Sequence, residues 1–426
     1  LARDSDADVI AVTTQVAEVG LDVSADTLHT DLAPAAAMIH IPTARFIDRY
    51  AGVGLCAALN IAGRLTGRHR ERISLDQVRS ILIIKFWGLG NLIEATPAFR
   101  AIRARFPNAR ITFLTLSCNR GVFDHYPHFD EILYMRDQSI RAVMSAFFTL
   151  PRLLRKRNID LAFDLDPIGR FCALMTFLSG ARIRVGYSTA NQYREHLYTR
   201  AIPLDEDKHV REMFLDLARG ADAHCADTDL DPVFIPDAEI QAADTLLEDC
   251  GIRASDRLVG ININASAVAY ERRWPLENFT ELARRITETH SVKLILCGSA
   301  DEAPYVRLLE QELTGNCVNL AGRTTLPGLA RILQRCELFI SNDSGPLHMA
   351  AAMNTPTISF FGPEHFKRYG PLGDRHKVFF AGLDCSPCIS FANEKQVRCP
   401  RNAECLRAIS VDMVWDAAHA RLAERG

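Results

Sequence analysis

The sequence predicts an α/β protein made of two doubly wound domains, each a parallel sheet with helices on both faces. Short apolar runs of strand length alternate with helix-length segments, and these runs lack the apolar–polar alternation of a half-exposed strand. Two such series occur, separated by a polar stretch at residues 224–256. The length of 426 residues fits two domains and an extension.

An N-terminal extension is expected over residues 1–75. Its first forty residues are rich in Ala and Asp, and the first twenty have a helical pattern. Residues 43–72 then form a basic amphipathic stretch, in which Phe46, Ile47, Tyr50, Leu55, Leu59 and Leu65 stand among Arg45, Arg49, Arg64, Arg68, Arg70 and Arg72. Two interpretations are open: a helix lying on an anionic membrane surface, or a helix packed on the protein with its arginines in water.

The first domain is expected over residues 76–235 and the second over 236–410. The expected strands of the first are 80–86, 111–116, 132–134 and 161–164, and those of the second are 258–263, 292–297, 317–320, 338–341 and 357–360. Doubly wound sheets bind ligands beyond the carboxyl ends of their strands, so two facing domains would share one cleft. A last helix, within 411–426, is expected to cross back to the first domain.

Composition narrows the class of protein. The chain is 48% hydrophobic and 24% charged, which suits a globular protein with large cores. A net charge of −3 gives no reason to expect a nucleic-acid partner. The chain shows no signal peptide, and its most apolar early run, residues 51–63, is too short to span a bilayer. We therefore expect a cytoplasmic protein, with peripheral contact to the inner face of a membrane if the basic stretch binds lipid.

Twelve cysteines in a chain of this size do not indicate a secreted disulfide framework. Eight are scattered through apolar segments and are expected in cores. The other four, Cys385, Cys388, Cys399 and Cys405, are clustered. Four thiolates in a reducing compartment suit a structural Zn²⁺, although the spacing of the second pair is loose; free thiols or a disulfide are the alternative.

A glycine-containing loop follows the first expected strand, with Gly88, Gly90 and Asn91, and leads into a helix that contains Glu94. Glycines let the backbone turn tightly and approach a ligand. The expected third glycine of a dinucleotide fingerprint is missing, so this loop alone is a weak signal.

A stronger signal follows strand 338–341, where the chain reads Asn-Asp-Ser-Gly-Pro-Leu-His-Met-Ala-Ala over residues 342–351. A strand that ends in Asp343, Ser344 and Gly345 before a helix presents N–H groups and a hydroxyl to a phosphate. Asp343 could instead cap the helix. His348 fits a packed helix position as well as a ligand-binding one.

These motifs, together with Arg-Arg-Trp-Pro at residues 272–275 and the Cys-rich tail, resemble glycosyltransferase family nine over residues 78–425. The resemblance implies a GT-B fold, in which two Rossmann-like domains face a cleft. It also implies an inverting transfer that needs no metal or other cofactor, commonly of heptose from ADP-heptose to a lipopolysaccharide-type glycolipid acceptor.

The resemblance also implies site residues. Asn264, Ser266 and Arg272, with Arg273 as a second cation, would hold the donor diphosphate, where a guanidinium grips phosphate bidentately. The remaining donor-binding positions are Glu302 for the ribose hydroxyls, Thr324 and Thr325 for the adenine, Ser344 and Gly345 for the phosphates, Asp343 for the donor's sugar or ribose, and His348 beside them. Gly88 and Gly90 would belong to the acceptor-side loop.

One position departs from the family pattern: Asn91 stands where the family has an Asp that is taken as general base. A neutral amide does not accept a proton at working pH. Glu94, which lies one turn further along the helix, is the first substitute, and Asp164 with Asp166 is the second. The third alternative is a protein without a base.

Two other functions stay open: a nucleotide-sugar epimerase of the same fold and a catalytically silent nucleotide-sugar-binding homologue. Acceptor contacts would lie in the first domain, near Arg120, Arg170, Arg184 and Tyr187. Arginines suit an anionic glycolipid, but no motif there is specific.

Overall fold

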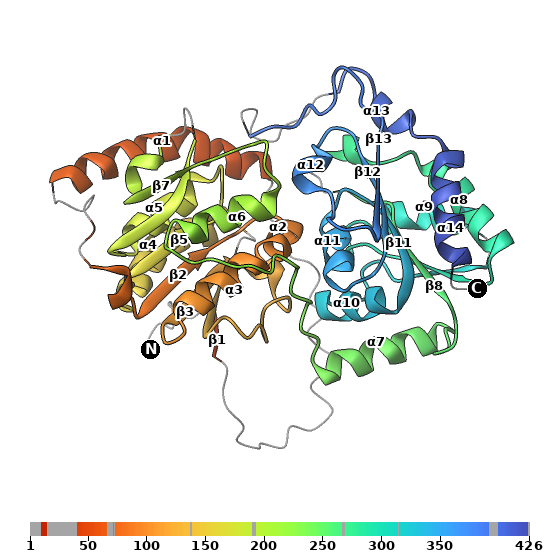
Figure 1. Cartoon of the computed structure of the whole chain (residues 1–426), viewed down its shortest axis with the longest axis horizontal. Helices are drawn as coiled ribbons and strands as arrows, with labels where there is room; N and C mark the ends of the chain where they lie inside the picture. The colour runs from red at the N-terminus through yellow and green to blue at the C-terminus, as the bar shows by residue number, and fades with distance from the viewer. Residues whose placement is uncertain are drawn as a thin grey trace. The chain divides into compact units, whose positions relative to one another are not determined.

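The computed structural model describes residues 10–14, 41–65, 71, 73–136, 139–189, 193–265, 269–313, 315–391 and 399–424. The chain divides into two compact units (Figure 1). Unit 1 contains Leu1–Trp87, Ala98–Asp205 and Met213–Asp227. Unit 2 contains Gly88–Pro97, Glu206–Glu212 and Thr228–Gly426. Two short segments from the first half of the sequence therefore belong to the second unit.

Unit 1 is built on a seven-stranded sheet in the order β1-β4-β3-β2-β5-β6-β7. The strands are β1 (Ile10–Thr14), β2 (Ser80–Ile84), β3 (Arg110–Leu116), β4 (Glu131–Met135), β5 (Leu161–Asp164), β6 (Ile183–Ser188) and β7 (Arg200–Pro203). All neighbours pair in parallel except β1, which pairs antiparallel with β4. The parallel part has the doubly wound order of a dinucleotide-binding sheet, with its switch point between β2 and β5.

The helical pattern expected in the first twenty residues is wrong where the structure describes them. Residues Ile10–Thr14 form strand β1 instead, in register with Met135 to Glu131 of β4. The segment reads Ile-Ala-Val-Thr-Thr, and β-branched residues favour a strand once a sheet edge offers hydrogen-bonding partners.

Three helices form one layer of unit 1: α1 (Ile41–Leu65), α4 (Ile140–Arg155) and α5 (Arg170–Leu178). Their inner sides pack against one face of the sheet, where Cys56, Leu150 and Cys172 join strand residues such as Leu82 and Leu133 in a buried cluster. The basic amphipathic stretch is therefore in large part helix α1, which is packed on α5. Arg68, Arg70 and Arg72 lie outside the described residues, as do the side chains of Arg45 and Arg49.

Unit 2 has a six-stranded parallel sheet in the order β10-β9-β8-β11-β12-β13. Its strands are β8 (Leu258–Asn262), β9 (Lys293–Leu296), β10 (Cys317–Asn319), β11 (Cys336–Asn342), β12 (Thr357–Phe361) and β13 (His376–Phe380). The order matches that of unit 1, so the switch point lies between β8 and β11. The elements α3 (Thr96–Arg105) and α6 (Val210–Arg219) each begin in unit 2 and continue in unit 1.

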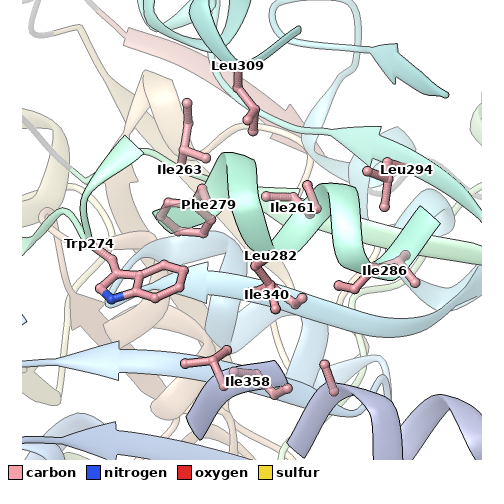
Figure 2. Packing of buried hydrophobic residues seen from close by; sticks show 14 of the residues in the cluster. Ile261, Ile263, Trp274, Phe279, Leu282, Ile286, Leu294, Leu309, Ile340 and Ile358 are labelled. Atoms are coloured by element: carbon pink, nitrogen blue, oxygen red, sulfur yellow. The ribbon is translucent and has the colours of Figure 1, made fainter. Parts of the chain in front are cut away.

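The helices of unit 2 are α2 (Leu89–Glu94), α7 (Asp237–Asp249), α8 (Leu276–Thr289), α9 (Ala303–Glu312), α10 (Leu326–Arg335), α11 (Gly345–Ala352), α12 (Phe366–Tyr369), α13 (Glu404–Arg407) and α14 (Val411–Ala423). In its core, Trp274 stacks on Phe360. The same ring meets Phe279 edge-on, and both residues are labelled in Figure 2. Its indole N–H donates to the carbonyl of Ile409 at 3.0 Å, which satisfies the one polar group of a fully buried ring.

The C-terminal helix α14 packs on unit 2, which corrects the expectation that it crosses back to the first domain. Val414, Ala418 and Leu422 are buried in the same cluster as Trp274. α14 contacts α8 and the strands β11 and β12. Among the described residues, no helix has the length and apolar character needed to cross a membrane.

Candidate functional site

The strongest site candidate is the carboxyl end of β8 and β11, the switch point of unit 2. Asn262 ends β8 and donates from its amide to the hydroxyls of Ser341 at 3.3 Å and Ser344 at 3.0 Å. The two hydroxyls are 2.9 Å apart. This network fixes the turn that leads from β11 into α11.

A second layer of asparagines holds the neighbouring loop. Asn342 accepts a hydrogen bond from the Trp274 backbone N–H at 2.8 Å and donates to the carbonyl of Ile263 at 2.9 Å. Asn264 donates to the carbonyl of Cys297 at 3.1 Å, while its side-chain oxygen is buried without a partner among the described residues. An unsatisfied buried acceptor beside this turn suits a ligand donor. Ser266, predicted to bind the donor beside it, lies outside the described residues.

The N-terminus of α11 is open toward this site. Ser344 is its N-cap residue with extended backbone angles, and its side chain makes no capping hydrogen bond. Asp343 is therefore not the cap. The first-turn N–H groups that a cap would otherwise satisfy suit an anion. A Cβ at Gly345 would lie 3.0 Å from Cβ of Leu89, so a larger residue here would press on α2.

Arg272 and Asp343 form an ion pair at this helix end. The Arg272 Nη1 donates to Asp343 Oδ2 at 2.9 Å, and both side chains are largely buried. The two predicted donor-binding residues are thus brought together by the η5 turn (Tyr270–Arg272) and the end of β11. The pair holds a guanidinium beside the open helix end, where a diphosphate can share it.

Arg273 lies between two aromatic rings. Its guanidinium is 4.5 Å from the centroid of Tyr270 and 4.1 Å from that of Tyr305. Stacked in this way, the cation is held in a fixed orientation, and its Nε is buried without a partner among the described residues. Tyr305 could not be predicted as a partner of Arg273, because it lies on α9, 32 positions further along the chain.

Glu302 and the two threonines occupy the ends of α9 and α10. Glu302 is the N-cap residue of α9 and accepts from the N–H and hydroxyl of Ser299 at 2.9 and 3.0 Å. Thr325 caps α10 and donates to Glu239 at 2.6 Å. Thr324 is half-buried beside it. These contacts show helix-end roles, and a nucleoside-binding role stays a prediction.

Glu94 is a buried structural carboxylate. It is fully buried in unit 2, where one oxygen receives His348 Nδ1 at 2.9 Å and the other receives Arg211 Nε at 3.0 Å. Burial raises the pKa of Glu94, but the hydrogen bond from His348 and the charges of His348 and Arg211 outweigh it and lower the pKa to about 2. A carboxylate enclosed in this way has no open oxygen for an acceptor hydroxyl, so the structure argues against Glu94 as the base.

The glycine loop of residues 88–90 belongs to unit 2, where its helix α2 packs on α11. It was expected on the acceptor side, in the first domain. Gly88 has a positive φ of 86° and begins the turn. A Cβ at Gly90 would overlap the ring of His348, so this glycine allows α2 to approach α11. Asn91, in the first turn of α2, remains half-exposed.

The alternative bases in unit 1 are buried as well. Asp164 is fully buried and accepts from the Tyr198 hydroxyl at 2.6 Å. Burial raises its pKa to about 6, although the charge of Arg194 opposes the shift. Asp166 pairs with Lys85 at 2.7 Å, and although burial raises its pKa, the charge and hydrogen bond of Lys85 together with the Phe86 N–H and the Cys172 thiol give a net lowering. These groups fill the switch point of unit 1 with an ionic network.

Three of the four residues predicted to contact an acceptor are buried: Arg170, Arg184 and Tyr187. Arg184 donates to the carbonyls of Leu197 at 2.7 Å and Ala181 at 2.8 Å, so its guanidinium ties backbone segments together. Only Arg120 is exposed, with its guanidinium 4.5 Å from the ring centroid of Tyr134. Burial of these three side chains indicates a role in holding the fold, and acceptor binding near them stays a prediction.

The cysteine cluster carries free thiols, with Cys385 and Cys388 exposed and Cys405 buried. Burial, followed by the neighbouring thiols of Cys405, Cys399 and Cys385, raises the pKa of Cys388 to about 11. Within the part of the chain that the structure describes, no group of three or more His, Cys, Asp or Glu side chains is placed to hold a metal ion. Zinc binding stays a prediction.

Sequence reasoning missed Asn262 and Arg211. Asn262 could have been found, because a polar residue at the end of an apolar strand points to the ligand edge of the sheet. Arg211 gave no such signal. Its partner Glu94 is 117 positions away, and only the return of the chain to unit 2 brings them together.

Comparison with known proteins identifies similar sequences over most of the chain. The model of glycosyltransferase family 9 (heptosyltransferase) matches residues 147–397. Lipooligosaccharide heptosyltransferase 2 of Campylobacter jejuni is 24% identical over 341 residues, which cover 76% of this chain and 94% of the relative. A short match of residues 2–41 to the C-terminal part of the nuclease/helicase Cas3 covers too little of the chain to show a family.

Two solved structures share the fold. A glycosyl transferase of family 9 from Veillonella parvula has a TM-score of 0.69 and 23% identity, and the match covers 83% of this chain and all of the other. The E. coli ADP-heptose lps heptosyltransferase II has a TM-score of 0.65 and 21% identity, with coverage of 81% and 99%. Both likenesses identify the two-domain fold of these enzymes in the present chain.

Proposed function

This chain belongs to glycosyltransferase family 9 (heptosyltransferase), and we propose that it transfers heptose from ADP-heptose to a lipopolysaccharide-type glycolipid. The observation that carries the proposal is the open N-terminus of α11 with Arg272 and Asp343 beside it, at the switch point of unit 2. The names of the similar heptosyltransferases of C. jejuni and E. coli support the sugar, the donor and the acceptor class.

In the proposed reaction, an acceptor hydroxyl oxygen attacks the anomeric carbon of the donor while the bond from that carbon to the diphosphate breaks. Negative charge develops on the departing ADP. Arg272 and the N–H of Gly345 lie where they can stabilise it, and Arg273 is the second cation. We propose that these groups make a metal ion unnecessary for the transfer, so that a chelator leaves turnover unchanged.

The acceptor hydroxyl must lose its proton without the carboxylate base that was expected from the sequence. Because Glu94 and Asp164 are fully buried, we propose that half-exposed Asn91 orients the acceptor hydroxyl through its amide and that no carboxylate acts as base at this position. The proton then leaves to water. Slow turnover is the expected consequence, since general-base catalysis typically contributes ~10²–10⁴-fold.

The remaining donor-binding residues are proposed from their positions near the carboxyl ends of the strands of unit 2. Asn264 has an unsatisfied buried oxygen beside the site, while Glu302 and Thr324 lie at the next strand ends. His348 is buried against Glu94, and we propose that it stabilises the start of α11 through this contact and does not touch the donor.

ADP release from ADP-heptose, with and without a deacylated lipopolysaccharide acceptor, tests the function. Acceptor-dependent release supports transfer. Lasting absence of release despite nucleotide binding would instead support a silent homologue, and interconversion of the donor sugar without an acceptor would support an epimerase. The match to a family of heptosyltransferases favours transfer over epimerisation.

A lipid-linked acceptor also implies work at a membrane surface, and we propose peripheral contact there.

The structural zinc hypothesis is tested separately, by elemental analysis of protein purified without chelator. About one zinc per chain would support it, and its absence would assign Cys385 and its neighbours to free thiols.

A further inference from the structure

The outer sides of helices α1 and α4 of unit 1 carry more apolar side chains than a water-exposed helix surface ordinarily does. The inner sides of these helices form a buried cluster with the sheet, and α5 contacts both α1 and α4. The opposite sides of α1 and α4 are directed away from that core. A helix in this position ordinarily shows polar residues to water.

The outer face of α1 is apolar instead. Gly52, Cys56 and Gly63 are buried against the unit, so positions 54, 58, 61 and 65 lie on the opposite side of the helix. These positions hold Gly, Ala, Ile and Leu, with Ile61 61% and Leu65 83% exposed. Helix α1 is the long orange-red helix in Figure 1. Its exposed stripe carries no charge of its own.

Helix α4 adds both apolar and basic groups. Met144 and Phe148 are 45% and 58% exposed, and they share the outer side of the helix with the exposed residues Arg141, Arg152 and Arg155. Large apolar side chains set among arginines on one helix face are typical of a helix in a membrane interface.

Arginines far outnumber acidic residues in helices α1, α4 and α5. The three helices contain seven arginines and a single acid, Asp48, which gives a formal charge of +6 in a chain whose net charge is −3. That one acid is engaged at the start of α5, where its oxygens accept from the N–H groups of Phe171 at 2.8 Å and Arg170 at 3.1 Å. Arg170 is buried and pairs with Asp48 at 3.5 Å, so the outward positive charge comes mainly from the exposed Arg141, Arg152 and Arg155 of α4.

We propose that this face, defined by Ile61 and Leu65 of α1 and by Met144, Phe148, Arg141 and Arg152 of α4, docks on an anionic lipid bilayer. The apolar side chains enter the boundary between headgroups and acyl chains, and the arginines bind lipid phosphates. The basic charge comes mainly from α4, whereas the sequence pointed only to the stretch that contains α1. The inference is independent of which sugar is transferred.

The test is co-sedimentation of the full chain with vesicles of phosphatidylglycerol and phosphatidylcholine in equal parts, and with vesicles of phosphatidylcholine alone. We expect binding to the anionic vesicles that weakens with salt. The double variant Ile61→Asp/Leu65→Asp and the single variant Phe148→Asp should each bind at least tenfold more weakly. Arg141→Gln and Arg152→Gln should each cost about 5-fold, which corresponds to ~1 kcal/mol per basic residue near an anionic surface.

Leu308→Asp is the matched control, because Leu308 is an exposed apolar residue (47%) on α9 of unit 2. It should leave vesicle binding unchanged. Thermal unfolding and ADP binding of every variant show that each is folded. Equal binding by wild type and the α1 and α4 variants would overturn the proposal. Sedimentation velocity without lipid gives a second way to overturn it. If wild type is a dimer and the α1 and α4 variants are monomers, the face is an interface between two copies.

Discussion

At the scale of single residues, burial separates candidate site residues into those that can reach a ligand and those that support the fold. Arg272, Asp343 and Ser344 meet at the open end of α11, whereas Glu94 and Asp164 are enclosed by their own partners. A sequence shows that a carboxylate lies near a motif. It does not show whether the oxygens point to solvent, because that depends on groups from other segments, such as Arg211 at 117 positions from Glu94 and Tyr198 at 34 positions from Asp164.

Replacing Arg272 tests the donor site. Arg272→Ala should weaken ADP binding by ~1.5–3 kcal/mol, the usual value of a hydrogen bond to a charged group. Isothermal titration calorimetry measures it. Arg284→Ala is the control, because Arg284 is an exposed arginine of the same unit that pairs with Glu312. Equal ADP affinities for both variants would show that the diphosphate binds elsewhere.

The buried Glu94 should make stability depend on pH. Its folded pKa of about 2 lies below the ordinary value of 4.5, so its contribution is fully present above pH 4.5 and is lost as the pH falls toward 2. Glu94→Gln should lower the free energy of unfolding at neutral pH by ~3–5 kcal/mol, because Arg211 is left without its counter-charge. Urea unfolding across this pH range measures both effects.

Glu312→Gln is the matched control, since it breaks an exposed ion pair worth ~0–1 kcal/mol. A Glu94→Gln variant as stable as this control would contradict the enclosed network. A loss of turnover by ~10²-fold or more in Glu94→Gln molecules that remain folded would restore Glu94 as the base.

Asn91→Asp tests the missing base directly. The two side chains are nearly isosteric, and the first turn of a helix favours a negative charge, so the variant should fold as wild type does. Turnover should rise, with a new acidic limb in the pH–rate profile below about pH 4, where an aspartate becomes protonated. Unchanged turnover would show that Asn91 does not face the acceptor hydroxyl.

At the scale of elements, the close packing of α2 on α11 connects the glycine loop to the turn that we propose binds the donor. Gly90 lies against His348 and Gly345 against Leu89, so the same contact uses a glycine from each motif. The sequence showed two glycine-containing turns and placed them in different domains. Strand order and helix contacts show that they form one structure.

Gly90→Ala should therefore destabilise the protein by ~1–3 kcal/mol, the usual cost of forcing an extra carbon into a packed site. Gly54→Ala is its control, because a Cβ at this exposed helical position meets nothing within 4 Å. It should stabilise by ~0.5–1 kcal/mol. Differential scanning calorimetry distinguishes the two, and a Gly90→Ala variant that melts with or above wild type would rule out the tight contact.

At the scale of the whole molecule, the two doubly wound sheets were predictable because buried parallel strands appear as continuous apolar runs. The nine predicted strand regions correspond to strands β2 to β5 and β8 to β12. Strands β7 and β13, which lie at sheet edges, and the internal strand β6 were missed, because their segments mix charged or polar residues with apolar ones. The path of the chain was not predictable, because residues 88–97 and 206–212 join unit 2 through contacts distant in sequence.

The most direct test of the account is the product itself. ADP-heptose and a heptose-deficient lipopolysaccharide acceptor are incubated with wild type and with Arg272→Ala, and the acceptor is then weighed by mass spectrometry. The account predicts an acceptor heavier by one heptose with wild type, and about tenfold to a hundredfold less of it with Arg272→Ala, as ~1.5–3 kcal/mol of lost charge stabilisation requires. An acceptor of unchanged mass would contradict it, whether the ADP-heptose has been consumed completely or is recovered in full.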